Sequence, residues 1–130
     1  PSSAKYPMAI GGYNSVTDGI YIESGRGYSM DGAIKADYAA PAVYVFTQNQ
    51  FGRYEAMTGT CAAAAVASGA CALLLEWNIS HIDNRNINSI ELRNQIINGT
   101  RRISNQLFPN REEGYGRLDI YQSILNMRNL

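Results

Sequence analysis

Cys61 lies where the sequence changes from a turn to a helix, and its thiol could act as a nucleophile. It follows Gly59 and Thr60 and precedes four consecutive alanines in TGTCAAAAVASGACALLL, residues 58–75. Backbone N–H groups at a helix N-terminus carry partial positive charge, which lowers the pKa of a thiol there and stabilises a developing oxyanion. Cys61 could instead be a small buried hydrophobic side chain, which is the common role of free cysteine.

A thiol nucleophile needs a general base within about 3 Å, and this chain offers few. The only histidine is His81, which follows the helix predicted over 60–77 at the end opposite Cys61. That helix would be about 25 Å long, so His81 cannot reach Cys61 within one copy. Glu55 precedes the turn and is expected to be a solvated surface carboxylate. The chain alone is therefore predicted to be catalytically inactive.

The elements that would position Cys61 are predicted as early strands and late helices, separated by polar loops. Strands are expected within residues 8–14, 18–24, 36–46 and 52–59, and helices within 60–77, 87–100 and 117–129. Thr60 is expected to serve as the N-cap of the first helix. The alanines and glycine of that helix allow close packing, so we expect it to be buried against strands. The pattern predicts one α/β domain, residues 1–130, equivalent to the later portion of such a fold.

The residues around Cys61 resemble the nucleophile signature of subtilisin-like serine peptidases, Gly-Thr-Ser-x-Ala-x-Pro followed by a buried helix. Gly59, Thr60, Ala63 and Gly69 match it, and Cys61 stands at the position of the nucleophilic serine. The stretches YPMAIGGYN, SGRGYSMDGAIKADYAAPAVYV and NREEGYGRLDIYQSI are also similar to the family, so the resemblance covers nearly the whole chain. Within the family, the sequence is most similar to clostridial members, including the group linked to spore germination.

The resemblance implies a subtilisin-like parallel-sheet fold with a buried nucleophile helix, and a parent endopeptidase that cleaves peptide bonds by acyl transfer. Cys61 would be the nucleophile and its N–H one oxyanion donor, while Thr60 and Gly59 would shape the turn and support the oxyanion. The family's catalytic aspartate and histidine and its oxyanion-hole asparagine lie upstream of the stretches that match here. The chain therefore resembles the C-terminal portion of the catalytic domain, and its implied partners are the missing N-terminal part and a peptide or protein substrate.

Two positions near the nucleophile depart from the family pattern. Cys61 replaces the serine, and Ala65 replaces the proline that follows it. The cysteine is a natural replacement in a protein with lost or weakened activity, an engineered Ser→Cys change, or a working thiol nucleophile. The alternative to an enzyme is a peptidase-like binding or regulatory protein without catalysis.

Composition argues against several other functions. Eleven basic residues balance eleven acidic ones, so no charge field indicates a nucleic acid or an acidic membrane as partner. The apolar run 61–75 is short for a membrane span and suits a buried helix. One histidine and two cysteines are too few for the usual zinc site, and no metal or cofactor is predicted.

The two cysteines and the expected open surface bear on assembly. Cys61 and Cys71 would lie about 15 Å apart along one helix, too far for a disulfide within the chain. A domain without its N-terminal part is expected to expose apolar surface and open sheet edges, through which copies could associate.

For localisation, the resemblance implies a secreted or spore-associated bacterial protein.

Overall fold

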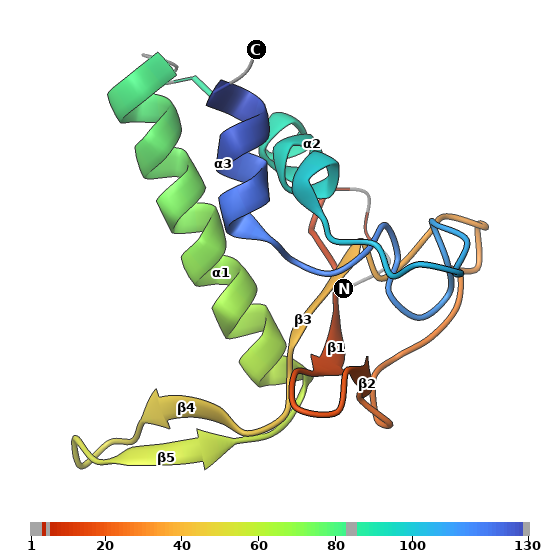
Figure 1. The fold of residues 1–130 in the computed structure, drawn as a ribbon, viewed down its shortest axis with the longest axis vertical. Coiled ribbons are helices and arrows are strands. Elements are labelled where there is room, and N and C mark those ends of the chain that lie inside the picture. The colour runs from red at the N-terminus through yellow and green to blue at the C-terminus, as the bar shows by residue number, and fades with distance from the viewer. Residues whose placement is uncertain (1–3, 5, 83–85, 129–130) are drawn as a thin grey trace.

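A computed structural model of the chain describes residue 4 and residues 6–82 and 86–128. The elements in chain order are β1 (Ile10–Asn14), β2 (Gly19–Ile20), β3 (Tyr38–Pro41), β4 (Val45–Gln48), β5 (Tyr54–Met57), α1 (Thr60–Trp77), the π-helix η1 (Asn78–Ile82), α2 (Ser89–Gly99) and α3 (Ile120–Arg128). Strands precede helices as the sequence predicts; α2 and α3 lie beside the C-terminal part of α1, while the N-terminal end of α1 reaches the strands (Figure 1).

Strand β1 is the centre of a three-stranded sheet in the order β2-β1-β3. It pairs in parallel with β3, where Ile10 lies opposite Tyr38, and antiparallel with the two-residue strand β2. The predicted parallel sheet is thus a single parallel pair within the described residues. Gly12 suits β1 because a Cβ there would lie 2.7 Å from the Cβ of Ala42, which is too close for a side chain.

A separate antiparallel hairpin, β4–β5, projects from the sheet below the N-terminal end of α1 (Figure 1). Val45 lies opposite Met57 in its ladder. The sequence predicts one strand within 36–46, but the structure divides that stretch between β3 and β4. Tyr44 causes the division, because its φ of 52° lies in the left-handed region and turns the chain away from the sheet.

Helix α1 has the predicted bounds, but its N-cap is Gly59 and not Thr60. The carbonyl of Gly59 accepts the N–H of Ala62 at 3.0 Å, which makes Thr60 the first helical residue. The prediction of a Thr60 cap was wrong because Gly59, with a φ of 150°, adopts a conformation that other residues rarely reach. No side-chain hydrogen bond caps this end of the helix among the described residues.

One face of α1 packs against the sheet and the other helices, while the opposite face is exposed. The buried face consists of Ala62, Ala63, Ala67, Ala70 and Leu74. The exposed face consists of Cys61, Ala64, Ala65, Ser68, Gly69, Ala72, Leu73 and Glu76. The expectation of a buried helix therefore holds for one face only in the described part of the chain.

The apolar helix continues beyond the run that the sequence analysis considered. From Thr60 to His81 it is long and apolar enough to cross a membrane by length and composition alone, with 28% of the apolar window buried. The core helix of a globular protein meets the same criterion. Packing of α1 on the sheet accounts for the apolar character of its buried face, whereas the apolar residues of the opposite face are exposed.

Helical structure continues past α1 into η1, where the sequence predicts a polar loop, and the hydrogen bonds of Asn78 support it. Its buried amide donates hydrogen bonds to the carbonyl of Leu74 at 2.8 Å and to Oε1 of Gln95 on α2 at 3.0 Å. The amide carbonyl accepts a hydrogen bond from Gln95 in return, at 3.1 Å. These bonds satisfy a buried polar side chain and connect the C-terminal end of α1 to α2.

Helices α2 and α3 form the rest of the helical layer and correspond to the two predicted later helices. Asn88 and Glu91 form a capping box at the start of α2. Gly99 allows α3 to approach closely, because a Cβ there would lie 2.1 Å from Oγ of Ser123. Leu92 and Ile96 of α2 pack into the same core as Tyr38 of β3.

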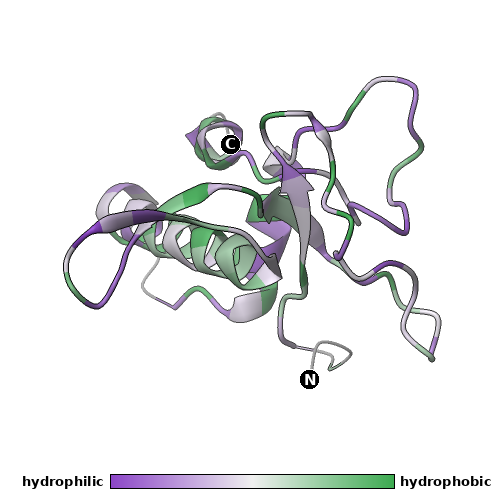
Figure 2. Cartoon of the chain, turned by 90° about the horizontal axis from the view of Figure 1, so that it is seen from below, coloured by the Kyte–Doolittle hydropathy of each residue, from purple (hydrophilic) through white to green (hydrophobic). Residues whose placement is uncertain are grey.

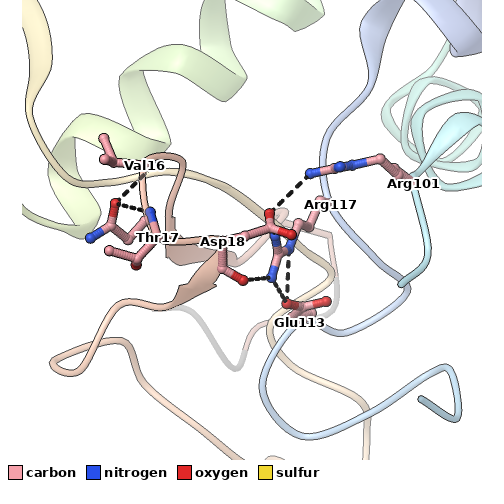
Figure 3. A network of polar contacts seen from close by, with 7 residues as sticks. Val16, Thr17, Asp18, Arg101, Glu113 and Arg117 are labelled. Atoms are coloured by element: carbon pink, nitrogen blue, oxygen red, sulfur yellow. Dashed lines mark hydrogen bonds and ion pairs between the residues drawn. The ribbon is translucent and has the colours of Figure 1, made fainter. Parts of the chain in front are cut away.

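A buried arginine connects the β1–β2 turn to the segment before α3 (Figure 3). The Arg117 guanidinium donates to Oε1 of Glu113 from Nε at 2.9 Å and from Nη2 at 2.7 Å. It also forms an ion pair with the carboxylate of Asp18 and donates to the carbonyl of that residue at 2.9 Å. Arg101 reaches the same carboxylate at 3.4 Å, and Arg117 lies 4.6 Å from the ring centroid of Tyr13. The β1–β2 turn is thus joined to the segment between α2 and α3.

Candidate functional site

The three predicted site residues lie together at the N-terminal end of α1. Cys61 is exposed, and its N–H and that of Thr60 belong to the first helical turn, where no preceding helical carbonyl is available. Neither N–H donates a hydrogen bond to another described residue. Two free donors therefore point outward from the helix end that carries the thiol, an arrangement that can bind a negatively charged oxygen.

Contacts with the hairpin and with the end of β3 build the turn that precedes Cys61. The N–H of Gly59 donates to the carbonyl of Ala42 at 2.8 Å. One residue earlier, Oγ1 of Thr58 accepts the N–H of Tyr44 at 3.1 Å. The turn is therefore held on one side by the chain leaving the sheet and on the other by the first turn of α1.

Thr60 borders a hollow on the sheet side of the turn. Ile10 and Gly11 of β1, Ala36, and the loop residues Arg26 and Tyr28 also line it. In Figures 1 and 2, the long loops that surround this part of the molecule extend away from the helices. Thr60 thus borders the hollow, and Cys61, which does not line it, is exposed beside it.

No candidate base stands beside Cys61 in the described residues. His81 stacks on Trp77, with ring centroids 3.7 Å apart and an interplanar angle of 11°, at the far end of the helix. Glu55 is exposed on β5, where its carboxylate accepts a hydrogen bond from Asn49 at 3.3 Å. Glu55 is exposed as the sequence analysis expects, whereas His81 lies in η1 and not in the predicted polar connection. Neither residue is hydrogen-bonded to Cys61.

Cys71, the second cysteine, has a different environment. It lies about ten residues further along α1, half-buried against the core near Tyr38. Burial raises the pKa of the Cys71 thiol, and burial also raises the pKa of Tyr38. Cys71 therefore keeps its proton at a pH where an ordinary thiol begins to ionise.

The two thiols are expected to react at different rates with iodoacetamide at pH 8. The thiolate is the reactive form, so the raised pKa and partial burial of Cys71 both slow its alkylation, and Cys61 should be modified at least about tenfold faster. Peptide mapping by mass spectrometry after timed quenching measures both rates in the intact protein. Equal rates in the folded protein would contradict this assignment, and a denatured sample, where both should react alike, is the control.

Asp37 is an important residue that the sequence analysis did not single out. Its carboxylate is fully buried and accepts the N–H of Ala9 at 2.7 Å, Nζ of Lys35 at 3.2 Å and Nη2 of Arg93 at 2.6 Å. It therefore joins the chain just before β1 to α2. The available signal was a charged residue in an otherwise apolar strand, ADYAAP, where burial requires partners.

The described residues contain no group of three or more His, Cys, Asp or Glu side chains that could hold a metal ion. The site consists of a thiol, backbone donors and a turn.

Comparisons with known proteins identify the class to which this arrangement belongs. The sequence model described as "Subtilase family" matches residues 1–116 of the chain. The chain therefore belongs to the subtilase family, which comprises subtilisin-like serine peptidases, and the α/β fold class predicted from the sequence is confirmed.

Three solved structures share the fold. The CspB protease of Clostridium perfringens is 26% identical, with a TM-score of 0.92 over 100% of this chain and 28% of that chain. The epidermin leader peptide processing serine protease EpiP of Staphylococcus aureus, solved as its S393A mutant, is 23% identical, with a TM-score of 0.75 over 100% and 33%. The prenylagaramide maturation protease PagA is 21% identical, with a TM-score of 0.76 over 96% and 44%. No curated protein matches the chain.

The chain spans between 28% and 44% of the length of these three structures. The matches to CspB and EpiP cover the whole of this chain, and hence the turn that carries Cys61.

Proposed function

We propose that residues 1–130 are the C-terminal portion of a subtilisin-like endopeptidase domain and carry its nucleophile at Cys61. One observation carries this proposal: an exposed thiol lies in the first turn of α1, beside two N–H groups that have no partner among the described residues. Membership of the subtilase family supports it. The substrate would be a peptide or protein.

The proposed chemistry follows from this geometry. A base from the remainder of the domain takes the thiol proton while the sulfur of Cys61 attacks the peptide carbonyl carbon. The carbonyl oxygen becomes an oxyanion and accepts the N–H of Cys61, and Thr60 supports it. The C–N bond then breaks, the amine leaves with the proton, and water hydrolyses the resulting thioester to free the carboxylate and the thiol.

The exposed face of α1 supports the proposal that a further part of the domain is missing. Alanines, Gly69 and Leu73 make up most of this face beside Cys61, Ser68 and Glu76, and Leu73 is 55% exposed. Small side chains on a helix allow another backbone to approach closely, and a contiguous apolar surface favours a partner. The missing N-terminal part of the same domain fits this face, and self-association of the chain is the alternative.

The cysteine favours a second candidate function. Because Cys61 stands where the family has serine, the parent protein could instead bind peptides or regulate a partner without cleaving them. Intact aspartate, histidine and asparagine motifs in the parent sequence would support the enzyme, and their loss would support the binding protein.

The 130-residue chain alone is expected to show no hydrolysis of peptides above the buffer rate, because none of the residues that the structure describes is placed to act as a base for Cys61. The parent protein is expected to cleave a quenched fluorescent peptide library, with the cut sites identified by mass spectrometry. Both samples should first show cooperative unfolding, so that inactivity cannot be attributed to misfolding. Hydrolysis by the chain alone would contradict the proposed dependence on a missing part, and no hydrolysis by the folded parent would contradict the enzyme.

A further inference from the structure

The hairpin β4–β5 leads directly into the nucleophile turn. Strand β5 ends at Met57 and α1 begins at Thr60, so only Thr58 and Gly59 separate them. Any change in the orientation of the hairpin base is therefore transmitted to the backbone that presents the N–H of Cys61.

The body of the hairpin has little packing to hold it in place. Phe46 and Phe51 are each 78% exposed and Tyr54 is 80% exposed. A cleft of about 220 Å³ separates the hairpin from the first turns of α1, with Met57 on one side and Ala65 on the other. The orientation of the hairpin therefore depends on contacts at its base.

Two hydrogen bonds form that base, and one of them uses a side chain. The N–H of Gly59 donates to the carbonyl of Ala42 at 2.8 Å, and the N–H of Tyr44 donates to Oγ1 of Thr58 at 3.1 Å. Tyr44 has a left-handed φ of 52°, which takes its N–H out of the regular ladder, and the Thr58 hydroxyl replaces the missing backbone acceptor. Left-handed residues other than glycine persist only where neighbouring contacts hold them.

We propose that Thr58 is a positioning residue for the nucleophile turn. By accepting the N–H of Tyr44, its hydroxyl fixes the hairpin base and thereby the direction of the N–H groups of Thr60 and Cys61. This inference rests on the proposed function, because the benefit of that fixed direction is a correctly placed oxyanion site.

The test compares Thr58→Val, which keeps the shape but removes the acceptor, with Thr58→Ser, which keeps the acceptor. In the parent protein, Thr58→Val is expected to lower kcat by about 10- to 100-fold with little change in KM, because a shift of about 1 Å can cost that much. Thr58→Ser should retain most of the activity. Thr17→Val, a matched change at an exposed threonine of the β1–β2 turn, should have no effect.

A second readout separates positioning from stability. A peptide aldehyde reacts reversibly with Cys61: the sulfur bonds to the carbonyl carbon, the thiol proton goes to the oxygen, and that oxygen accepts the free N–H groups. Thr58→Val should weaken this adduct by about 10-fold or more but leave alkylation by iodoacetamide, which needs no oxyanion site, unchanged. A general loosening of the fold would instead accelerate alkylation.

If the parent neither cleaves peptides nor binds the aldehyde, the proposed function is contradicted but the positioning role of Thr58 is not. Hydrogen exchange tests that role independently of activity. The Gly59 amide should exchange at least about 10-fold faster in Thr58→Val than in Thr58→Ser, while amides of α2 remain unchanged. Unchanged exchange at Gly59 in a folded Thr58→Val variant would overturn the inference. Equal impairment of the valine and serine variants would also overturn it, because the hydroxyl would then be irrelevant.

Discussion

Replacement of Cys61 by alanine in the parent protein is expected to abolish peptide hydrolysis, with a loss of at least about 10³-fold in kcat/KM. Removal of the sulfur eliminates the attacking atom, whereas the backbone donors and the fold remain. The progress of cleavage of a quenched fluorescent peptide measures the loss. The Cys61→Ser variant should remain active, because it restores the hydroxyl that the family uses at this position.

The matched control for this prediction is Cys71→Ala. This cysteine lies on the same helix but half-buried against the core, where its thiol takes no part in the proposed chemistry. Activity of Cys71→Ala should stay close to that of the unsubstituted protein. Persistent hydrolysis by Cys61→Ala, or equal losses in the two variants, would show that Cys61 is not the nucleophile.

Replacement of Asp37 by asparagine is expected to destabilise the fold by about 2–4 kcal/mol. Each partner of the buried carboxylate is a donor: the N–H of Ala9, Nζ of Lys35 and the guanidinium of Arg93. An asparagine offers one acceptor oxygen and turns an NH₂ group toward the remaining donors. The lower end of the range reflects the partial exposure of the two cations, at 15% for Lys35 and 28% for Arg93, which lets water solvate them.

Urea denaturation of the parent protein followed by circular dichroism measures this loss. Asp31→Asn is the control, because Asp31 belongs to the same loop but its carboxylate is exposed and bonded to the neighbouring Ser29 hydroxyl. It should leave the denaturation midpoint almost unchanged. An Asp37→Asn midpoint equal to that of the control would show that the buried carboxylate contributes no net stability.

The elements that carry strong local signals could be predicted from the sequence. The alanine-rich run gave α1 with its bounds, since its residues favour a helix in almost any context. Helices α2 and α3 also fall within the predicted ranges, and α2 begins with the capping box of Asn88 and Glu91. The class of the fold followed from the order of these elements and from the family resemblance.

Features that depend on long-range contacts could not be predicted. The hairpin β4–β5 exists because Tyr44 adopts a left-handed conformation, which residue type does not reveal. The cap of α1 is Gly59 because the N–H of that residue is bound to Ala42, which is 17 residues earlier in the sequence. The partners of Asp37 come from three separate segments. For the candidate site, the helix start at Cys61 predicts exposed backbone donors there, and in the structure the N–H groups of Thr60 and Cys61 have no partner among the described residues; the hydrogen bonds that shape the turn before them could not be predicted.

The ion pair between Asp18 and Arg117 joins residues 99 positions apart. During synthesis, the β1–β2 turn leaves the ribosome long before the arginine that secures it, and β1 must wait for β3 to gain its parallel neighbour. Such distant pairing delays the completion of folding. Strand β1 therefore has only β2 as a neighbour until β3 has been made, and the β1–β2 turn lacks its arginine partner until residue 117 has been synthesised.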